Sequence, residues 1–278
     1  MRLKPNTEST NWTSLARGKL VLLSKRVFIS HPKPPLPHIS SGYQVTLRKS
    51  TIDFGQFHIE YIPENDAVFL WSPTKGNVVH ITVVKADTGG GKSSLLLQIY
   101  RYLRSRSSSP VNIHFDPDMN EPKNIAVAFL AQKAPTIAHW KVRSLLPDSS
   151  AFADALLPQH PVLSRNKMRV GELSGGECAR LYASSALEQL SASPTHAAFL
   201  LLDETFEGIG EEDHVSQCVN KIKALWTERH AHKHLHMMIV SHKQVGERGL
   251  AIPDSLLLSL NVISRVRDHE IQVSVQNT

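Results

Sequence analysis

A glycine-rich segment that ends in lysine and serine carries the clearest chemical signal in this sequence. Residues 86–93 read Ala-Asp-Thr-Gly-Gly-Gly-Lys-Ser, which matches the phosphate-binding loop G-x-x-x-x-G-K-[ST] except that Ala86 replaces the first glycine. Glycines let successive backbone N–H groups face one anion, and a helix that begins there adds partial positive charge. We predict that Lys92 meets the β- and γ-phosphates of ATP and that Ser93 ligates Mg²⁺. The predicted phosphate-binding residues are Asp87, Thr88, Gly89, Gly90, Gly91, Lys92, Ser93 and Ser94.

Two further segments place polar groups where chemistry is expected. A continuous apolar run at 197–203 is typical of a buried strand, and it ends in the carboxylates Asp203 and Glu204. Ligands of α/β sheets bind at the carboxyl ends of strands, so Asp203 is placed to hold Mg²⁺ through water and Glu204 to polarise an attacking water as general base. Residues 173–177 read Leu-Ser-Gly-Gly-Glu at the start of a predicted helix, which makes a second anion site.

Each of the three segments also has a purely structural explanation. The alternatives are an ordinary glycine-rich turn at 86–93, an exposed acidic turn after residue 202, and a plain helix start with Ser174 as N-cap. Two more polar residues follow predicted buried strands: Gln132 lies in AFLAQKAP and His242 in IVSH. The order of all five elements along one chain is what favours the functional interpretation.

Together these segments resemble the ABC ATPase family, in which a phosphate loop, a glutamine loop, the signature LSGGQ, a strand ending in DE and a histidine follow in that order. The resemblance spans roughly residues 43–275. It implies an α/β fold, namely a P-loop NTPase nucleotide-binding domain of the ABC type with a mixed core sheet, an antiparallel β subdomain and a small α-helical subdomain.

The resemblance also implies roles and partners. ATP and Mg²⁺ are the expected ligands, with Ser93, Gln132 and Asp203 at the metal and Gln132 also sensing the γ-phosphate. Glu204 and His242 are the expected catalytic residues. The signature residues, which would contact ATP held by a second ABC domain in a homodimer or heterodimer, are Leu173, Ser174, Gly175, Gly176 and Glu177.

Three positions depart from the family pattern or leave a role open. Gly210 stands where the family usually has an aspartate, and Glu177 replaces the common glutamine of the signature. The family stacks adenine on an aromatic side chain upstream of the phosphate loop. Tyr61 is the predicted stacking residue, with Phe57 and Tyr43 as competitors and a core role as the alternative for each.

Hydrophobic patterning supplies the elements that would position these residues. We expect strands at 78–84, 125–131, 197–203 and 237–242, and helices following the phosphate loop, at 177–190 and at 211–228. Residues 43–71 are predicted to form a mostly antiparallel meander, residues 136–172 several short helices, and the C-terminal segment two strands. The alternating histidines of RHAHKHLH (His230, His232, His234 and His236) favour a solvated loop over a metal site.

The composition of the chain limits the classes of protein to which it can belong. The 278 residues carry a formal net charge of +6 and two cysteines, too few for a disulfide framework. No apolar run approaches the roughly 20 residues of a membrane helix. We expect residues 1–42, which include HPKPPLP, to be an N-terminal extension or linker, residues 43–278 to form the ABC ATPase domain, and its helical subdomain to span approximately 133–190.

The process that the ATPase would drive has three candidate answers. The segment between Gln132 and Leu173 has room only for a compact helical subdomain, which favours the ATP-binding subunit of a transporter that works with a separate membrane permease, located in the cytoplasm or at the inner face of the membrane. The basic charge and LSGGE favour a non-transport ATPase acting on nucleic acid or ribosomes, the less favoured reading. A degenerate regulatory domain fits poorly with the presence of Lys92, Glu204 and His242.

Overall fold

Two β-sheets organise the fold, which is described here from a computed structural model. The described residues are 44–53, 58–71, 77–105, 113–116, 125–132, 137–206, 212–241, 252, 255–266 and 270–277. Several sequence predictions fall outside them: those for residues 1–42, Tyr43, Phe57, Gly210 and His242.

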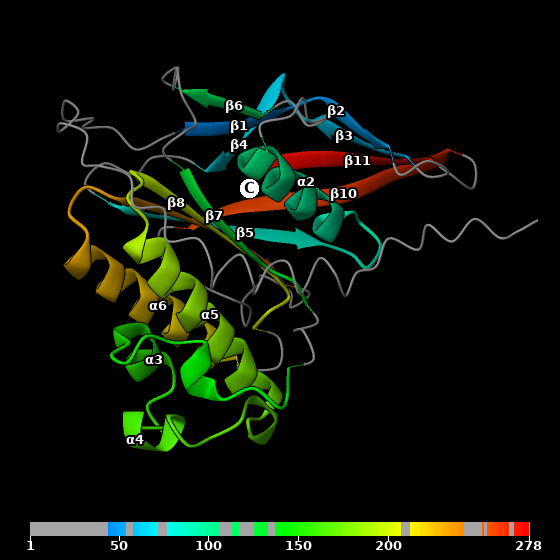
Figure 1. Ribbon diagram of the computed structural model, residues 1–278. Helices are drawn as coiled ribbons and strands as arrows, with labels where there is room; N and C mark the ends of the chain where they lie inside the picture. The colour runs from blue at the N-terminus through cyan, green and yellow to red at the C-terminus, as the bar shows by residue number, and fades with distance from the viewer. Residues whose placement is uncertain are drawn as a thin grey trace, which may run out of the picture.

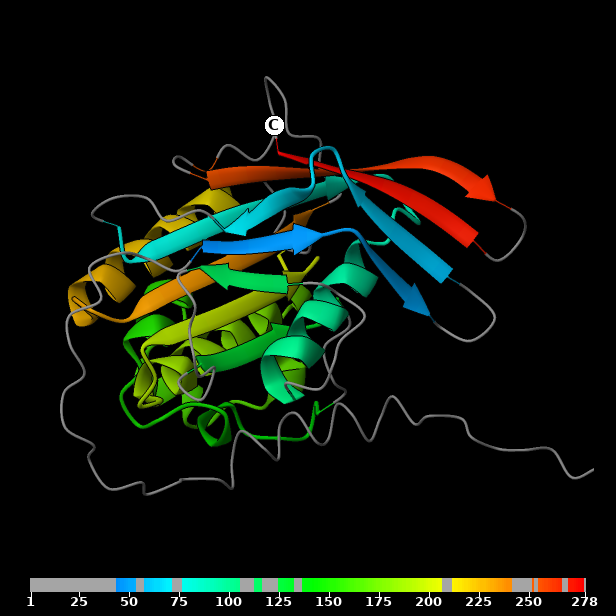
Figure 2. The ribbon, with the colours of Figure 1, turned by 90° about the horizontal axis from the view of Figure 1, so that it is seen from above.

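The large sheet has eight strands, and its centre is parallel. Their order across the sheet is β2 (Ser50–Asp53), β3 (His58–Pro63), β11 (Glu270–Asn277), β10 (Ser255–Val266), β5 (Val79–Ala86), β9 (His234–Ser241), β8 (Ala197–Asp203) and β7 (Ile125–Leu130). Strands β10, β5, β9, β8 and β7 are all parallel to one another. At the other edge β11 is antiparallel to β10 and parallel to β3, and β2 is antiparallel to β3. Seen from above, β2, β3, β10 and β11 extend together beyond the rest of the molecule (Figure 2).

A second, three-stranded antiparallel sheet and one helix cover one face of the large sheet. The small sheet has the order β4 (Ala67–Trp71), β1 (Gln44–Arg48) and β6 (Ile113–Asp116). Helix α2 (Lys92–Ser105) follows β5 and lies on the same side of the large sheet as this small sheet (Figure 1). Their apolar side chains form one core with the large sheet, which includes Leu47 of β1 and Leu95 and Ile99 of α2.

The remaining helices lie on the opposite face (Figure 1). They are α3 (Ala151–Leu156), α4 (Val162–Arg165), α5 (Gly175–Ala192) and α6 (Glu212–Arg229), with 3-10 turns at Val142–Ser144 and Val170–Glu172. Side chains of α5 and α6 form a second core with the sheet, and a third, smaller core joins α5 to the short helical segments through Val142, Leu157 and Leu181. Helix α5 therefore connects the sheet to the helical segments.

Strand β8 shows why the sheet is covered on both faces. All seven of its residues are buried, and successive side chains of a strand point to opposite faces. Phe199 and Leu201 pack into the core that contains α2, whereas Leu200 and Leu202 pack into the core that contains α5 and α6. A continuous apolar run is therefore needed, since burying each such side chain is worth about 1.5–3 kcal/mol.

The predicted fold class is confirmed, with a mixed core sheet, an antiparallel β unit and a small helical unit. Two local predictions are wrong. Within 43–71 the strand pairs β1–β4 and β2–β3 are antiparallel as predicted, but they do not form one meander, because they lie in different sheets and β3 also pairs in parallel with β11. The histidines of 230–236 do not all lie in a loop, because β9 begins at His234, and His236 is fully buried in a stack with His80 and Phe199.

Candidate functional site

The parallel strands bring the phosphate loop, Asp203 and Gln132 to one edge of the large sheet. Strand β5 ends at Ala86 and leads into the phosphate loop (residues 86–93), β8 ends at Asp203, and β7 ends two residues before Gln132. Parallel neighbours share the edge at which their carboxyl ends lie. His242 directly follows the last residue of β9 in the sequence, but it lies outside the described residues, so its role stays a prediction.

The backbone of the phosphate loop has the turns that its glycines allow. Gly89 and Gly91 have φ angles of 81° and 80°, and the N–H of Gly90 donates to the carbonyl of Asp87 at 3.0 Å. A Cβ on Gly90 would lie 2.9 Å from the Cβ of Ala86, so the absent side chain makes room for that alanine. Ala86 itself is not among the described residues with positive φ. Alanine in place of the first glycine is therefore compatible with this loop.

Lys92 lies beneath the loop that it would use to bind phosphate. Its side chain is buried, and Nζ donates to the carbonyls of Ala86 at 2.8 Å and Asp87 at 3.1 Å. These bonds turn two carbonyl groups of the loop toward the ammonium group. The ammonium group thereby occupies both acceptor atoms and offsets the repulsion that they would exert on an approaching anion.

Tyr61 does not have the position that was predicted for it. Its side chain has no exposed surface, so the ring offers no face on which adenine can stack. The hydroxyl instead donates to the carbonyl of Gly91 at 2.8 Å, and a Cβ on Gly91 would lie 2.8 Å from that hydroxyl oxygen. Burial raises the pKa of Tyr61 above its ordinary value, so the hydroxyl remains a donor. We replace the stacking role with a supporting one under the phosphate loop.

Ser93 and Asp203 meet where a metal would be expected. The hydroxyl of Ser93 donates to Oδ1 of Asp203 at 2.9 Å, although the two residues come from different elements, α2 and β8. Asp203 is buried and Ser93 is exposed. Hydroxyl and carboxylate oxygens are ligands that Mg²⁺ prefers, so Ser93 and Asp203 are residues that would hold such an ion.

Glu204 is held by a glutamine from the neighbouring strand. Nε2 of Gln132 donates to Oε2 of Glu204, and the hydroxyl of Thr205 donates to the carbonyl of Leu130 at 3.1 Å, so β7 and the turn after β8 are tied twice. Glu204 has a φ of 51°, the only positive φ among the described residues other than glycine. Such a conformation costs about 1–3 kcal/mol and recurs at functional sites. Here the residue that has this conformation is also buried.

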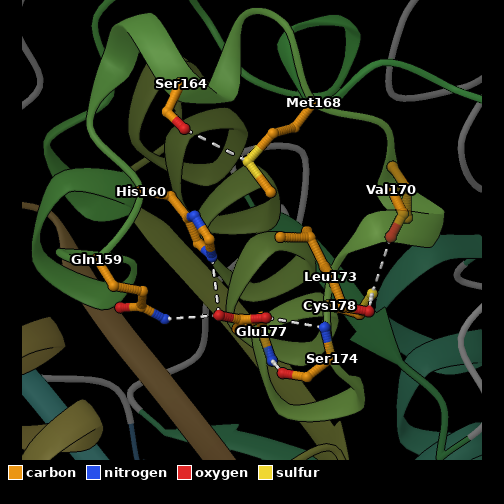
Figure 3. Close-up of polar contacts among 9 residues, drawn as sticks. All are labelled: Gln159, His160, Ser164, Met168, Val170, Leu173, Ser174, Glu177 and Cys178. Atoms are coloured by element: carbon orange, nitrogen blue, oxygen red, sulfur yellow. Dashed lines mark hydrogen bonds and ion pairs between the residues drawn. The ribbon is translucent and has the colours of Figure 1, made fainter.

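The signature segment (residues 173–177) begins α5 with a complete capping box. The hydroxyl of Ser174 accepts from the N–H of Glu177 at 3.3 Å, and the carboxylate of Glu177 accepts from the N–H of Ser174 at 2.8 Å (Figure 3). Ser174 is therefore the N-cap of α5, as the purely structural explanation of this segment predicts. Gly175 is exposed, and a Cβ placed on it would meet no atom within 4 Å. This glycine is thus not required by packing within the chain.

Two residues that sequence reasoning missed bind the signature segment. Nε2 of His160 lies 2.8 Å from Oε1 of Glu177, and Nε2 of Gln159 donates to the same oxygen at 3.2 Å (Figure 3). The hydrogen bonds from Ser174, Gln159 and His160 together lower the pKa of Glu177 to about 2, the backbone N–H of Ser174 contributing most. No motif marks Gln159 or His160, since they lie in an irregular stretch well before the signature.

Comparisons with known proteins give similarity of fold only. No family model matches the chain, and no curated protein matches it. Among solved structures, a ribosome-bound archaeal Pelota and ABCE1 model matches with a TM-score of 0.45 and 15% identity over 92% of this chain, and an RNase-L inhibitor with 0.45 and 17% over 86%. This chain spans 36% and 40% of their lengths. A dimeric bacterial ABC transporter cassette matches with a TM-score of 0.38 and 15% identity, covering 82% of this chain and 96% of that one.

These TM-scores lie below 0.5, so the likenesses decide neither the family of this chain nor the function of its residues. At these levels of similarity the roles of individual residues rest on the loop, strand and helix geometry given above. In the part of the chain that the structure describes, no helix is long and apolar enough to cross a membrane.

Proposed function

We propose that this chain is an ABC-type ATPase domain, which binds ATP with Mg²⁺ in the phosphate loop and hydrolyses it to ADP and phosphate. The observation that carries the proposal is the hydrogen bond between Ser93 and Asp203, 2.9 Å long, together with the buried Lys92 that precedes Ser93 in the sequence. It joins the end of the phosphate loop to the end of β8, two segments that the sequence separates by more than a hundred residues. An ordinary glycine-rich turn would not need that partner.

The residues divide the work of phosphoryl transfer between binding and proton handling. Ser93, Asp203 and Gln132 would hold Mg²⁺, which when bound neutralises charge on the phosphates. The N–H groups of the phosphate loop and the ammonium of Lys92 bind the β- and γ-phosphates. Glu204 takes a proton from water, while the amide of Gln132, which donates to Oε2, holds its carboxylate in place. His242 is proposed as a second group at the γ-phosphate.

We further propose that a second ABC domain completes the site. Phosphoryl transfer depends mainly on positioning and charge stabilisation, so donors from two chains can be shared across one nucleotide. The exposed Gly175, where an added Cβ would meet no atom within 4 Å apart from its own helix and chain neighbours, supports an approach of the signature segment to a ligand from outside. ATP would then join two copies, because each copy supplies only part of its contacts.

The test pairs one binding variant with one catalytic variant. Lys92→Ala should weaken ATP binding about tenfold or more, because it removes a charged hydrogen-bond donor to phosphate. Glu204→Gln should bind ATP normally and lower kcat roughly 100-fold or more, because general base catalysis contributes that much. The exposed residues Lys141 and Glu172 supply matched controls, as Lys141→Ala and Glu172→Gln. Wild-type affinity in Lys92→Ala, or undiminished turnover in Glu204→Gln, contradicts the proposal.

For the process that hydrolysis drives, we propose transport with a separate membrane permease. The support is the compact helical segment between Gln132 and the signature, where a long inserted arm is lacking. The net charge of +6 favours the second candidate, an ATPase that acts on nucleic acid or ribosomes. We also propose that residues 1–42 are an extension to a domain formed by residues 43–278, with a helical subdomain at about 133–190.

One capture experiment separates the two processes. Glu204→Gln, purified from membrane and from cytosolic fractions with ATP and Mg²⁺, should retain a protein with several membrane spans if the transporter proposal holds. Nucleic acid that copurifies and is lost as salt rises would instead support the second candidate, because phosphate contacts release counterions.

A further inference from the structure

Glu177 is more tightly held than a capping box requires. Its Oε2 accepts a hydrogen bond from the N–H of Ser174. Its Oε1 is hydrogen-bonded to two side chains of the loop between α3 and α4, Nε2 of Gln159 at 3.2 Å and Nε2 of His160 at 2.8 Å (Figure 3). Both carboxylate oxygens are thus occupied, and the side chains of His160 and Glu177 are each only 19% exposed. A capped helix would need the first of these bonds alone.

The ionisation of Glu177 determines which atom donates in its hydrogen bond with His160. The carboxyl group of Glu177 has a pKa of about 2, so at neutral pH it is ionised and can only accept hydrogen bonds. Nε2 of His160 must therefore carry the proton that lies between the two atoms. Such charge-assisted bonds are about twice as strong as neutral ones, and this one is partly shielded from water.

This anchoring leaves one exposed donor at the start of α5. The capping box uses the N–H groups of Ser174 and Glu177. The first four N–H groups of a helix have no partner within it, and of the other two residues in this turn Gly175 is exposed whereas Gly176 is buried, so the N–H of Gly175 remains for a ligand. Its direction depends on the first turn of α5, whose conformation Glu177 holds. A thiol contact on the other side, from Cys178 to the carbonyl of Val170 at 3.5 Å, fixes the incoming chain.

We propose that His160 and Gln159 are positioning residues of the composite ATP site, which hold Glu177 so that the exposed N–H group of Gly175 faces the nucleotide bound by a second copy of this chain. The inference rests on the proposed function. It adds a link from the α3–α4 loop to the signature segment, through which displacement of that loop alters ATP hydrolysis at the partner's phosphate loop.

The first experiment compares three single variants with the wild-type protein. His160→Ala should lower kcat about tenfold, because one charge-assisted hydrogen bond is lost, and Gln159→Ala should lower it less. ATP affinity, measured at a protein concentration too low for association, should stay within about twofold because Lys92 and its loop are untouched. His139→Ala removes an exposed histidine of the same helical segment and serves as the control.

The second experiment mixes variants and separates positioning from general loss of structure. In a twofold pair each copy gives its phosphate loop to one site and its signature to the other. A mixture of His160→Ala with Lys92→Ala contains one site made of two intact halves, so turnover should rise above that of either variant alone. A mixture of His160→Ala with Ser174→Arg, both altered at the signature, should show no such rise.

The outcomes separate this inference from the proposed function. If the wild-type chain neither binds nor hydrolyses ATP, the proposed function fails. If the wild type is active and both His160→Ala and Gln159→Ala match it, only the positioning role fails. The positioning role is also overturned if turnover rises when His160→Ala is mixed with Ser174→Arg, or if it does not rise when His160→Ala is mixed with Lys92→Ala. Because Gln159 is exposed, Gln159→Ala preserves the test if His160→Ala does not fold.

Discussion

At the scale of single residues, the phosphate loop depends on groups that hold its carbonyl oxygens away from an anion. The carbonyl of Gly91 accepts from the N–H of Leu95 at 2.9 Å and from the hydroxyl of Tyr61 at 2.8 Å. Lys92 occupies the carbonyls of Ala86 and Asp87. A backbone that binds anions must direct its N–H groups inward, and each of these contacts removes a carbonyl from that position.

Tyr61→Phe tests this arrangement by removing only one hydroxyl. The ring remains to fill its buried site, while the carbonyl of Gly91 loses one of its two donors. A neutral hydrogen bond contributes about 0.5–1.5 kcal/mol, so ATP affinity should fall roughly 2- to 10-fold. Titration calorimetry measures it. Tyr100→Phe, which removes a hydroxyl on α2 that contacts Arg104, is the control. Equal affinities for Tyr61→Phe and wild type would show that the loop holds its shape without this bond.

At the scale of elements, helix α5 is fixed at both ends. Its first turn has the capping box and the bonds from Gln159 and His160. At its end the ammonium of Lys233 donates to the carbonyls of Leu190, Ser191 and Ser193, and its burial lowers the pKa of Lys233 to about 8. Positive charge at a helix C-terminus is favourable because the last carbonyls lack partners. The signature segment is thus carried on a helix that cannot easily shift along its axis.

The pH dependence of stability measures the N-terminal anchor. The pKa of Glu177 is lowered from 4.5 to about 2 in the folded chain, so its stabilisation is fully present above pH 4.5 and is lost as pH falls toward 2. The difference in unfolding free energy between wild type and Glu177→Gln should be constant from pH 7 to about 5 and shrink below that. Denaturant titrations at each pH measure it, with Glu172→Gln as control. If the difference in unfolding free energy grew as the pH was lowered, the predicted direction of the pH dependence would be wrong.

The type of an element could be predicted from the sequence where the hydrophobic pattern alone decides it. The neighbour with which each strand pairs could not. The apolar run of β8 was predicted with its observed bounds, and α5 begins two residues before its predicted start. The parallel pairing of β3 with β11 joins residues more than two hundred positions apart, and alternation indicates a strand's faces but not its neighbour. For the same reason Tyr61 was assigned to adenine: its burial depends on the strands that flank β3 and on the loop above it.

At the scale of the whole molecule, the two anion-binding turns belong to different parts of the fold. The phosphate loop joins β5 to α2, and α2 packs with the small sheet on one face of the large sheet. The signature segment begins α5 on the opposite face, where its side-chain partners are Gln159 and His160 (Figure 1). Under the proposed function, the signature segment would then meet a nucleotide held by another molecule, and activity would be a property of the pair.

Ser174→Arg tests the dependence on a pair most directly. Arginine at the exposed Ser174 adds bulk to the face proposed to meet the partner's nucleotide, while Lys92, Ser93 and Asp203 remain unchanged. The variant should bind ATP as the wild type does, but two chains of it should not associate when ATP is present. Its turnover should fall at least about 100-fold, since a shared site is required for transition-state stabilisation. Sedimentation with ATP and Mg²⁺ in the Glu204→Gln background measures association. Turnover per chain in the wild type should in turn fall on dilution. Turnover that is constant on dilution, together with an active Ser174→Arg, would mean that one chain suffices.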